Sequence, residues 1–308
     1  MSKTIPLLIC ATVSAALAGC ATSVPYNDGQ RVYNEKISRA KNLADPFGYK
    51  DLRDVKAPEG MNVSSDGALL LDTAGWAANF HAAAGSGFLP GTSNWGSAIG
   101  WGLGISLLSS AFAPTPITEK DAAFGYVPVS KASTALEARN LFAKQWTEAM
   151  EATLRDMYPK AKIETDYADY KKTMLVGAFY VGAVSITDES IGCFGYKGDD
   201  AKRPREDHCT ASIAVFTQKE VLTTPPSYFE GTSEQSHRLA RSDIYTFSGQ
   251  KNAIDWTKIM AASVKYLPEH TVVYVAPHKT GDGKKSPPMV LEKDRINLFI
   301  KPQSTAEK

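Results

Sequence analysis

The sequence has few of the side chains that metal and nucleophile chemistry require. Four cysteines and five histidines occur among its 308 residues, and no Cys-x-x-Cys, His-Glu-x-x-His or Gly-x-Ser-x-Gly motif is present. His237 is the best candidate for acid–base work, because two arginines and an aspartate follow it closely. These charged neighbours are also typical of a solvated loop, and we favour that interpretation. The sequence therefore predicts no catalytic residue, no metal site and no cofactor, and we expect the protein not to be an enzyme.

A phosphate-binding loop is also lacking. The nearest approach to one is the run HKTGDGKKSPP at residues 278–288. Lys284 is not followed directly by Ser or Thr, and two prolines oppose the helix whose amino terminus would hold a phosphate. This run predicts a turn between two strands instead.

The chain has no excess of charge of either sign. It contains 34 basic and 33 acidic residues, and removal of Lys3 with the signal peptide described below leaves 34 − 1 = 33 basic residues against 33 acidic ones. Since no stripe of Lys or Arg occurs, we expect no nucleic-acid partner. The hydrophobic residues (43%) and charged residues (22%) occur at the frequencies of an ordinary globular protein.

Charge is missing altogether from one internal segment. No Asp, Glu, Lys or Arg occurs between Thr73 and Thr118, a stretch of 46 residues. Within it, residues 95–113 give 19 consecutive uncharged positions, close to the ~20 that a membrane-spanning helix needs. Glycines and a proline at residues 85–91 divide the segment into two halves. The pattern predicts an apolar helical hairpin rich in Gly and Ala.

Tryptophans and evenly spaced glycines characterise this predicted hairpin. Tryptophan is enriched at membrane interfaces, and a glycine at every fourth position lets two membrane helices approach closely. Each glycine costs a water-soluble helix up to ~1 kcal/mol relative to alanine, so we expect no isolated helix in water. Membrane contact, burial in a core or an oligomer interface, and disorder stay open as alternatives. The predicted membrane or oligomer contacts are Trp76, Trp95, Gly96, Gly100, Trp101 and Gly104.

The amino terminus has the pattern of a secretory signal peptide. Lys3 precedes an apolar run at residues 5–17, which is too short for a finished transmembrane helix. The tetrad Leu-Ala-Gly-Cys that ends at Cys20 resembles the lipobox of bacterial lipoproteins. The resemblance implies cleavage before Cys20, acylation of Cys20 and stable anchoring to a bilayer. Ala21, in place of an aspartate, implies sorting to the outer membrane. The alternative is an ordinary signal peptide in which Cys20 is incidental.

The remaining cysteines form one pair. Cys10 leaves with the signal peptide and Cys20 is assigned to lipid, so Cys193 and Cys209 are left in an oxidising compartment. An even pair there is expected to form a disulfide. A zinc site or a catalytic thiol is the alternative, but apart from His208 we find no partner for either.

The second half of the chain has the patterns of a mixed α and β domain. Thr134 and Glu137 match a capping box, and apolar residues at helical spacing follow up to Met157. A second helix is predicted after Asn252. A short amphipathic helix is predicted earlier, at residues 30–44. Strands are predicted at residues 173–187, 210–217, 242–247, 271–276 and 295–300. We therefore expect an α+β fold: a two-layer domain of mostly antiparallel sheet with two helices, preceded by the Gly/Ala-rich apolar hairpin.

These features give a domain plan. The expected parts are a lipoprotein signal peptide (1–19), a lipidated tether with a short helix (20–72), the uncharged membrane or oligomer segment (73–118), the α+β soluble domain (119–302) and a tail (303–308).

The hypothesis that we favour is a structural or assembly lipoprotein of a cell-envelope machine for secretion or conjugation. Its expected partners are the lipid bilayer, through acylated Cys20, and either copies of itself or an envelope protein complex. It would be anchored to the outer membrane, with most of the chain in the periplasm or on the cell surface. A periplasmic ligand- or lipid-binding lipoprotein is one alternative, and an enzyme without a recognisable motif is another. The layout also resembles that of the surface-exclusion lipoproteins of conjugative plasmids.

Overall fold

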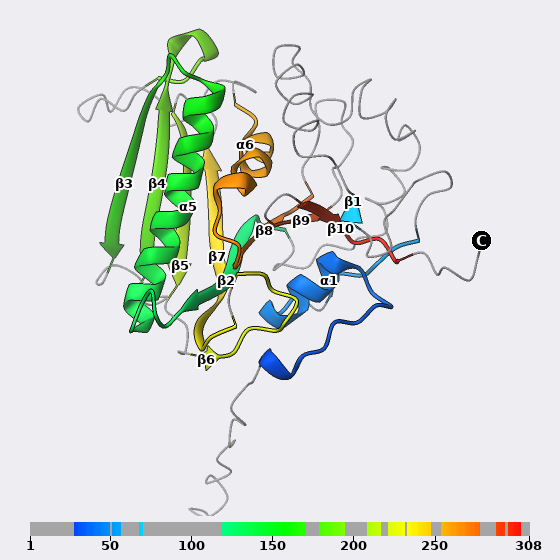
Figure 1. Cartoon of the computed structure of the whole chain (residues 1–308). Coiled ribbons are helices and arrows are strands. Elements are labelled where there is room, and N and C mark those ends of the chain that lie inside the picture. The colour runs from blue at the N-terminus through cyan, green and yellow to red at the C-terminus, as the bar shows by residue number, and fades with distance from the viewer. Residues whose placement is uncertain are drawn as a thin grey trace, which may run out of the picture.

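An antiparallel sheet of ten strands is the framework of the computed structural model (Figure 1). The structure describes residues 28–49, 51–56, 68–69, 119–170, 179–194, 208–216, 221–231, 233–247, 254–277, 288–292 and 295–302. The strands are β1 (Ala68–Leu69), β2 (Ala122–Pro128), β3 (Lys162–Tyr170), β4 (Phe179–Thr187), β5 (Cys209–Phe216), β6 (Leu222–Thr223), β7 (Ser236–Phe247), β8 (Thr271–Val275), β9 (Met289–Glu292) and β10 (Arg295–Leu298). Their order is β1-β10-β9-β8-β2-β7-β5-β4-β3, and β6 pairs with β7. Each of these strand pairs is antiparallel.

The α+β class and the mostly antiparallel sheet were both predicted and are confirmed. The predicted hairpin at residues 73–118 lies outside the described residues. Among the described residues, no helix is long and apolar enough to cross a membrane.

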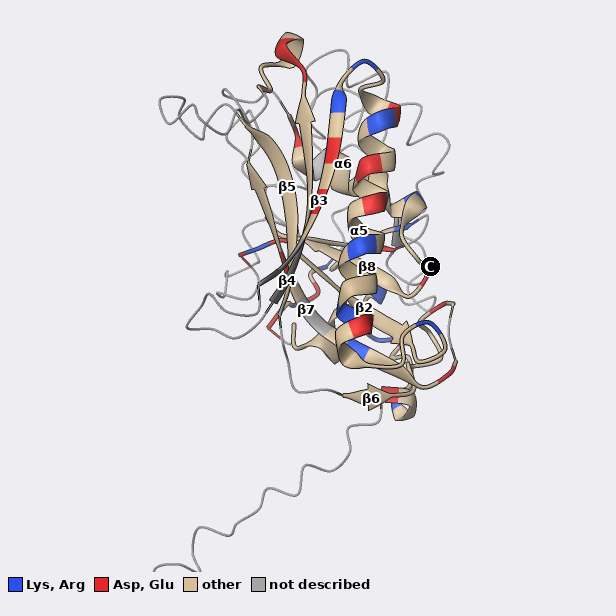
Figure 2. Ribbon diagram, turned by 90° about the vertical axis from the view of Figure 1, so that its left-hand side faces the viewer, with Lys and Arg blue, Asp and Glu red and all other residues tan. Residues whose placement is uncertain are grey.

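Helix α5 (Ala135–Met157) covers one face of the sheet (Figures 1 and 2). The Thr134 hydroxyl accepts the backbone N–H of Glu137, and the Glu137 carboxylate accepts the backbone N–H of Thr134. The predicted capping box and the predicted helix are therefore confirmed. Large apolar side chains on the inner side of α5 are fully buried against β3, β4 and β5; they are Phe142, Trp146, Met150 and Leu154. The shorter helix α6 (Trp256–Ser263) packs beside α5 over the same core.

Strand β2 lies near the middle of the sheet and is buried along its whole length. Side chains of a strand alternate between the two faces of its sheet. Ala123 and Val127 pack into the core under α5, whereas Phe124 and Tyr126 pack into a second core on the opposite face. Both faces of the central strands are therefore covered, so the predicted two-layer arrangement is wrong here, and β2 shows no polar alternation. This is why the sequence analysis missed it.

The second core is covered by the first described part of the chain, residues 28–49 and 51–56, which we call the N-terminal strap. It contains three short helices: η1 (Asp28–Gln30), α1 (Arg39–Ala44) and η2 (Asp45–Phe47). The prediction of one helix over residues 30–44 is wrong in its first half. Helix α1 starts only after Ser38, whose hydroxyl accepts the backbone N–H of Lys41, and residues 31–37 are not helical.

The strands also differ from the prediction at several places. The polar run around His237, predicted to be a solvated loop, belongs to the long strand β7, so that prediction is wrong. Strand β3 was also missed. Its sequence KIETDYADY mixes charges of both signs, as an edge strand does to avoid pairing with other chains. The run at residues 278–288 lies between β8 and its antiparallel neighbour β9 in the chain, but residues 278–287 lie outside the described residues, so the turn stays a prediction.

A disulfide joins Cys193, just after β4, to Cys209 at the start of β5 (Cα–Cα 5.4 Å). Both cysteines are buried in the core under α5. The predicted pairing is therefore present in the structure, where it closes the connection between two neighbouring strands.

Removal of this disulfide is expected to destabilise the domain. Closure of a loop of about 15 residues stabilises a fold by ~3 kcal/mol in the chain-entropy model. We therefore expect the double substitution Cys193→Ala and Cys209→Ala to lower the free energy of unfolding by about that amount, as measured by urea denaturation. Dithiothreitol should destabilise the wild-type domain and leave the double variant unchanged. Equal sensitivity of the two proteins to the reductant would contradict this prediction.

Candidate functional site

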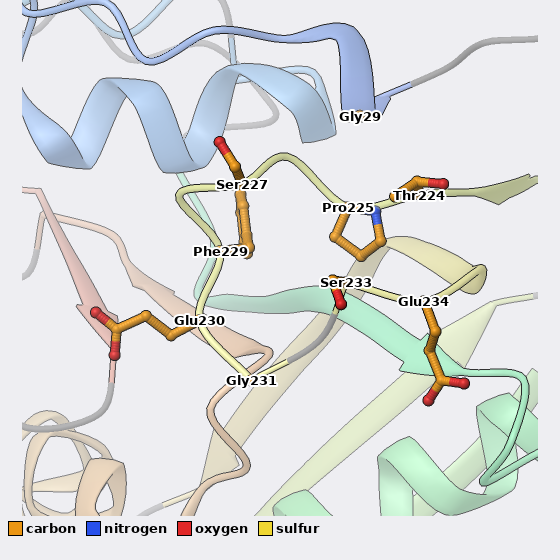
Figure 3. A pocket seen from close by; sticks show the side chains of 9 residues that line it. All are labelled: Gly29, Thr224, Pro225, Ser227, Phe229, Glu230, Gly231, Ser233 and Glu234. Carbon is orange, nitrogen blue, oxygen red and sulfur yellow. The ribbon is translucent and has the colours of Figure 1, made fainter.

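An open groove of about 770 Å³ lies between the N-terminal strap and the loop that follows β6 (Figure 3). The run TPPSYFEGTSE at residues 224–234 supplies most of its lining, and Gly29 of η1 supplies the rest. Two prolines and Gly231, which has a positive φ of 87°, break regular structure in this run and keep it a loop. The lining residues are Gly29, Thr224, Pro225, Ser227, Phe229, Glu230, Gly231, Ser233 and Glu234.

The polar side chains of the groove are hydroxyls and carboxylates, and none of its lining residues is basic. Glu230 lies 3.6 Å from the guanidinium of Arg39 and 3.8 Å from that of Arg295. Glu234 accepts a hydrogen bond of 2.5 Å from the hydroxyl of Ser130. Figure 3 shows these two carboxylates on opposite sides of the loop and pointing away from each other. The two carboxylates therefore do not converge on one point in the groove (Figure 3).

Behind Glu230, a buried ion pair fixes the N-terminal strap to the sheet. Arg39 of α1 donates two hydrogen bonds to the carboxylate of Glu292 on β9, one of them through Nη2 to Oε2 at 3.1 Å. Both residues are less than a tenth exposed. Burial raises the pKa of Glu292, although Arg39 opposes that shift. Loss of either partner would leave a buried charge with only a more distant and more exposed counter-charge, so the pair favours this one position of the strap.

A second buried carboxylate holds the very start of the strap. Asp28 is fully buried; its Oδ2 accepts a hydrogen bond of 3.0 Å from the Tyr126 hydroxyl and lies 3.6 Å from the guanidinium of Arg238. Arg31 donates to the other carboxylate oxygen at 3.2 Å. The backbone N–H of Asp28 donates to the hydroxyl of Thr223 on β6 at 2.8 Å. We call this set of contacts the Asp28 clasp.

The clasp has an electrostatic cost. Burial raises the pKa of Asp28 to about 6, although Arg238 and the Tyr126 hydroxyl act to lower it. Burial likewise raises the pKa of Tyr126, which therefore stays a hydrogen-bond donor. The clasp joins η1, β2, β6 and β7, and it forms one end of the groove through the neighbouring Gly29.

Aromatic rings connect the groove to the second core. Phe229 of the groove loop packs edge-on against Phe47 of η2 and Tyr126 of β2, with ring centroids 5.7 and 5.0 Å apart. Phe47 also stacks on Phe124 at 4.5 Å. Because such ring pairs add to the area that they bury, the loop, the strap and the sheet pack as one unit here.

The histidine that sequence reasoning singled out is a buried structural residue. His237 is 2% exposed, and its Nε2 lies 3.0 Å from the backbone carbonyl of Ala132. The nearby His270 is also buried, and burial lowers its pKa to about 4. Neither histidine lines the groove.

The other predicted site residues fall outside the described part of the chain. These are Cys20, Trp76, Trp95, Gly96, Gly100, Trp101 and Gly104. Conversely, sequence reasoning missed Asp28, Arg39 and Glu292, whose partners are distant in sequence. The Pro-Pro and Gly in residues 224–234 would have indicated a loop, but nothing in the sequence placed that loop beside the strap.

Within the ranges that the structure describes, no group of three or more His, Cys, Asp or Glu residues could hold a metal ion. No protein-family model matches the sequence, and comparisons with curated proteins and with solved structures give no match either.

The two buried titratable groups are expected to act on stability in opposite directions. Asp28 has an ordinary pKa of 3.8 and a folded pKa of about 6. Between these values the folded state binds more protons, so the free energy of unfolding falls as the pH rises. His270 has an ordinary pKa of 6.5 and a folded pKa of about 4, so in that window the free energy of unfolding rises with pH. Each contribution amounts to about 3 kcal/mol at most.

We therefore expect Asp28→Asn to make the free energy of unfolding increase more steeply between pH 4 and 6 than in the wild type. His270→Gln should have the reverse effect on the slope. Urea denaturation at several pH values measures both, and Glu148→Gln on the exposed side of α5 is the matched control. Identical pH profiles for Asp28→Asn and the wild type would show that Asp28 does not titrate as the clasp requires.

Proposed function

We propose that the protein is a non-enzymatic outer-membrane lipoprotein that acts as an assembly component of a cell-envelope machine. The lipobox-like tetrad ending at Cys20 supports acylation of Cys20 as a membrane anchor. The uncharged segment at residues 73–118 supports a contact with other proteins or with lipid. The disulfide between Cys193 and Cys209 supports an oxidising compartment such as the periplasm.

The observation that carries this proposal is the position on β2 of two points: the contact of Asp28 with Tyr126, and the entry of the chain at Ala122 after the uncharged segment. The clasp holds Asp28, eight residues after Cys20, to Tyr126 in the second half of β2. The uncharged segment returns to the fold just before the first residue of the same strand, Ala122. The tether and the uncharged segment therefore join the sheet toward opposite ends of its central strand.

This arrangement favours a protein contact over insertion beside the anchor. The four residue steps from Ala122 to Tyr126 span about 13 Å of strand, and Glu119 precedes Ala122 by three residues more. Glu119, the first described residue after the uncharged segment, lies toward the other end of β2 from the Tyr126–Asp28 contact, which supports a role for the segment in meeting another copy of the chain or another envelope protein. We therefore propose self-association through residues 73–118 as its role.

One observation favours a second candidate, a periplasmic ligand- or lipid-binding lipoprotein. The groove of about 770 Å³ falls within the range of sizes common for small-molecule sites. Its lining is more polar than in most such sites, which is why we rank this function second.

The assembly proposal is tested by the mass of two exported variants in mild detergent. One carries Cys20→Ser, and the other carries the same substitution with residues 73–118 replaced by a flexible Gly-Ser linker of about 20 residues. We expect light scattering to find a defined oligomer for the first and a folded monomer for the second. Two monomers would contradict the assembly function and direct attention to the groove.

The anchor is tested separately by the intact mass of the wild-type protein from membranes. We expect a chain that begins at Cys20 and carries acyl groups, and an unacylated mass for Cys20→Ser. A wild-type chain without acyl groups would contradict the lipoprotein assignment whatever its oligomeric state.

A further inference from the structure

Two apolar side chains are exposed at the end of the molecule where the tether arrives. Val32, four residues after Asp28, is 86% exposed, and Leu222 of β6 is 44% exposed. Thr223, the neighbour of Leu222, accepts the backbone N–H of Asp28, so both side chains belong to the same end of the fold. We call η1, residues 31–33 and β6 the anchor end. In both overall views this end lies at the bottom of the molecule (Figures 1 and 2).

The part of the tether between Cys20 and Asp28 is too short to let this end of the fold move far from a membrane. From Cys20 to Asp28 the chain advances eight residues, which span at most about 28 Å when fully extended. The Asp28 clasp prevents the strap from lengthening this reach, since Asp28 is tied to β2, β6 and β7. Acyl chains on Cys20 therefore keep the anchor end within a short distance of the lipid headgroups.

We infer that the anchor end rests on the bilayer surface, with Val32 and Leu222 in the headgroup region. This inference rests on the acylation of Cys20 that is proposed above. Two side chains alone give weak binding, but a tether raises their effective concentration at the surface into the millimolar range or above. The same contact would orient the sheet, because the clasp fixes β2 and β7 to this end.

The charges near the anchor end cancel, so its contact with the bilayer is mainly apolar. Asp28 and Arg31 form an ion pair, and just beyond the anchor end the exposed side chains of Glu35 and Lys36 offset each other. Without a net positive patch, attraction to anionic lipids contributes little. We therefore expect the contact to depend on Val32 and Leu222 and to be insensitive to salt.

The experiment uses the acylated full-length protein in phosphatidylcholine vesicles that carry a nitroxide quencher on the headgroup. One fluorophore is attached either to Gln30→Cys, at the anchor end, or to Lys160→Cys, in the exposed turn between α5 and β3. Labelling is specific because Cys20 is acylated and the Cys193–Cys209 pair is oxidised. We expect strong quenching at position 30 and little at position 160.

Insertion of 20 Gly-Ser residues between Cys20 and Asp28 separates surface binding from mere tethering. With the spacer, we expect position 30 to stay quenched in the otherwise native protein. Adding Val32→Ser and Leu222→Ser to the spacer protein should reduce the quenching at least fivefold, whereas adding Phe247→Ser should not. Phe247 is 55% exposed but ends β7, ten residues beyond the one that pairs with Leu222, which makes it a matched control.

Loss of quenching with the spacer alone would overturn the inference, because the tether would then be the only link. Equal quenching with and without Val32→Ser and Leu222→Ser would overturn it as well. The intact mass of the same samples shows whether Cys20 is acylated, so a failure of the anchor is distinguished from a failure of the surface contact.

Discussion

The structure depends on the attachment of the N-terminal strap to the face of the sheet opposite α5. A sheet with apolar residues on both faces of its central strands needs a cover on each, and α5 supplies only one. Phe124, Tyr126 and Tyr274 on the other face are fully buried because the strap lies over them. Two buried carboxylates, that of Asp28 at the start of the strap and that of Glu292 on β9, hold the strap against the sheet.

This attachment bears on the proposed function, because the strap is the first part of the chain after Cys20 that the structure describes. If Cys20 carries lipid, as we propose, any pull on that anchor acts through the Asp28 clasp on the middle strands of the sheet. The groove beside Gly29 and the exposed Val32 and Leu222 belong to the same end. Under the proposed function, anchoring, the groove and the orientation of the domain on a membrane would share one set of contacts.

Sequence reasoning predicted the features that depend on local patterns. The capping box at Thr134, the amphipathic helix α5 and the Cys193–Cys209 pair need only nearby residues or a count of cysteines, and the structure contains all three. Strand β2 was missed because burial on both faces removes the polar alternation that identifies a strand. The clasp was missed because its partners lie 98 and 195 residues away from Asp28 in the chain. A polar residue with distant partners looks the same in sequence as a polar residue in water.

Amide hydrogen exchange of the strap tests the central claim most directly. If the clasp makes the strap and the sheet one unit, the amides of Asn42 and Gly48, which donate within the strap, should exchange nearly as slowly as those of β2. Asp28→Ala should then speed exchange in the strap and leave the amides of α5 unchanged. Strap amides that exchange rapidly in the wild type, at the same rate as in Asp28→Ala, would contradict the account.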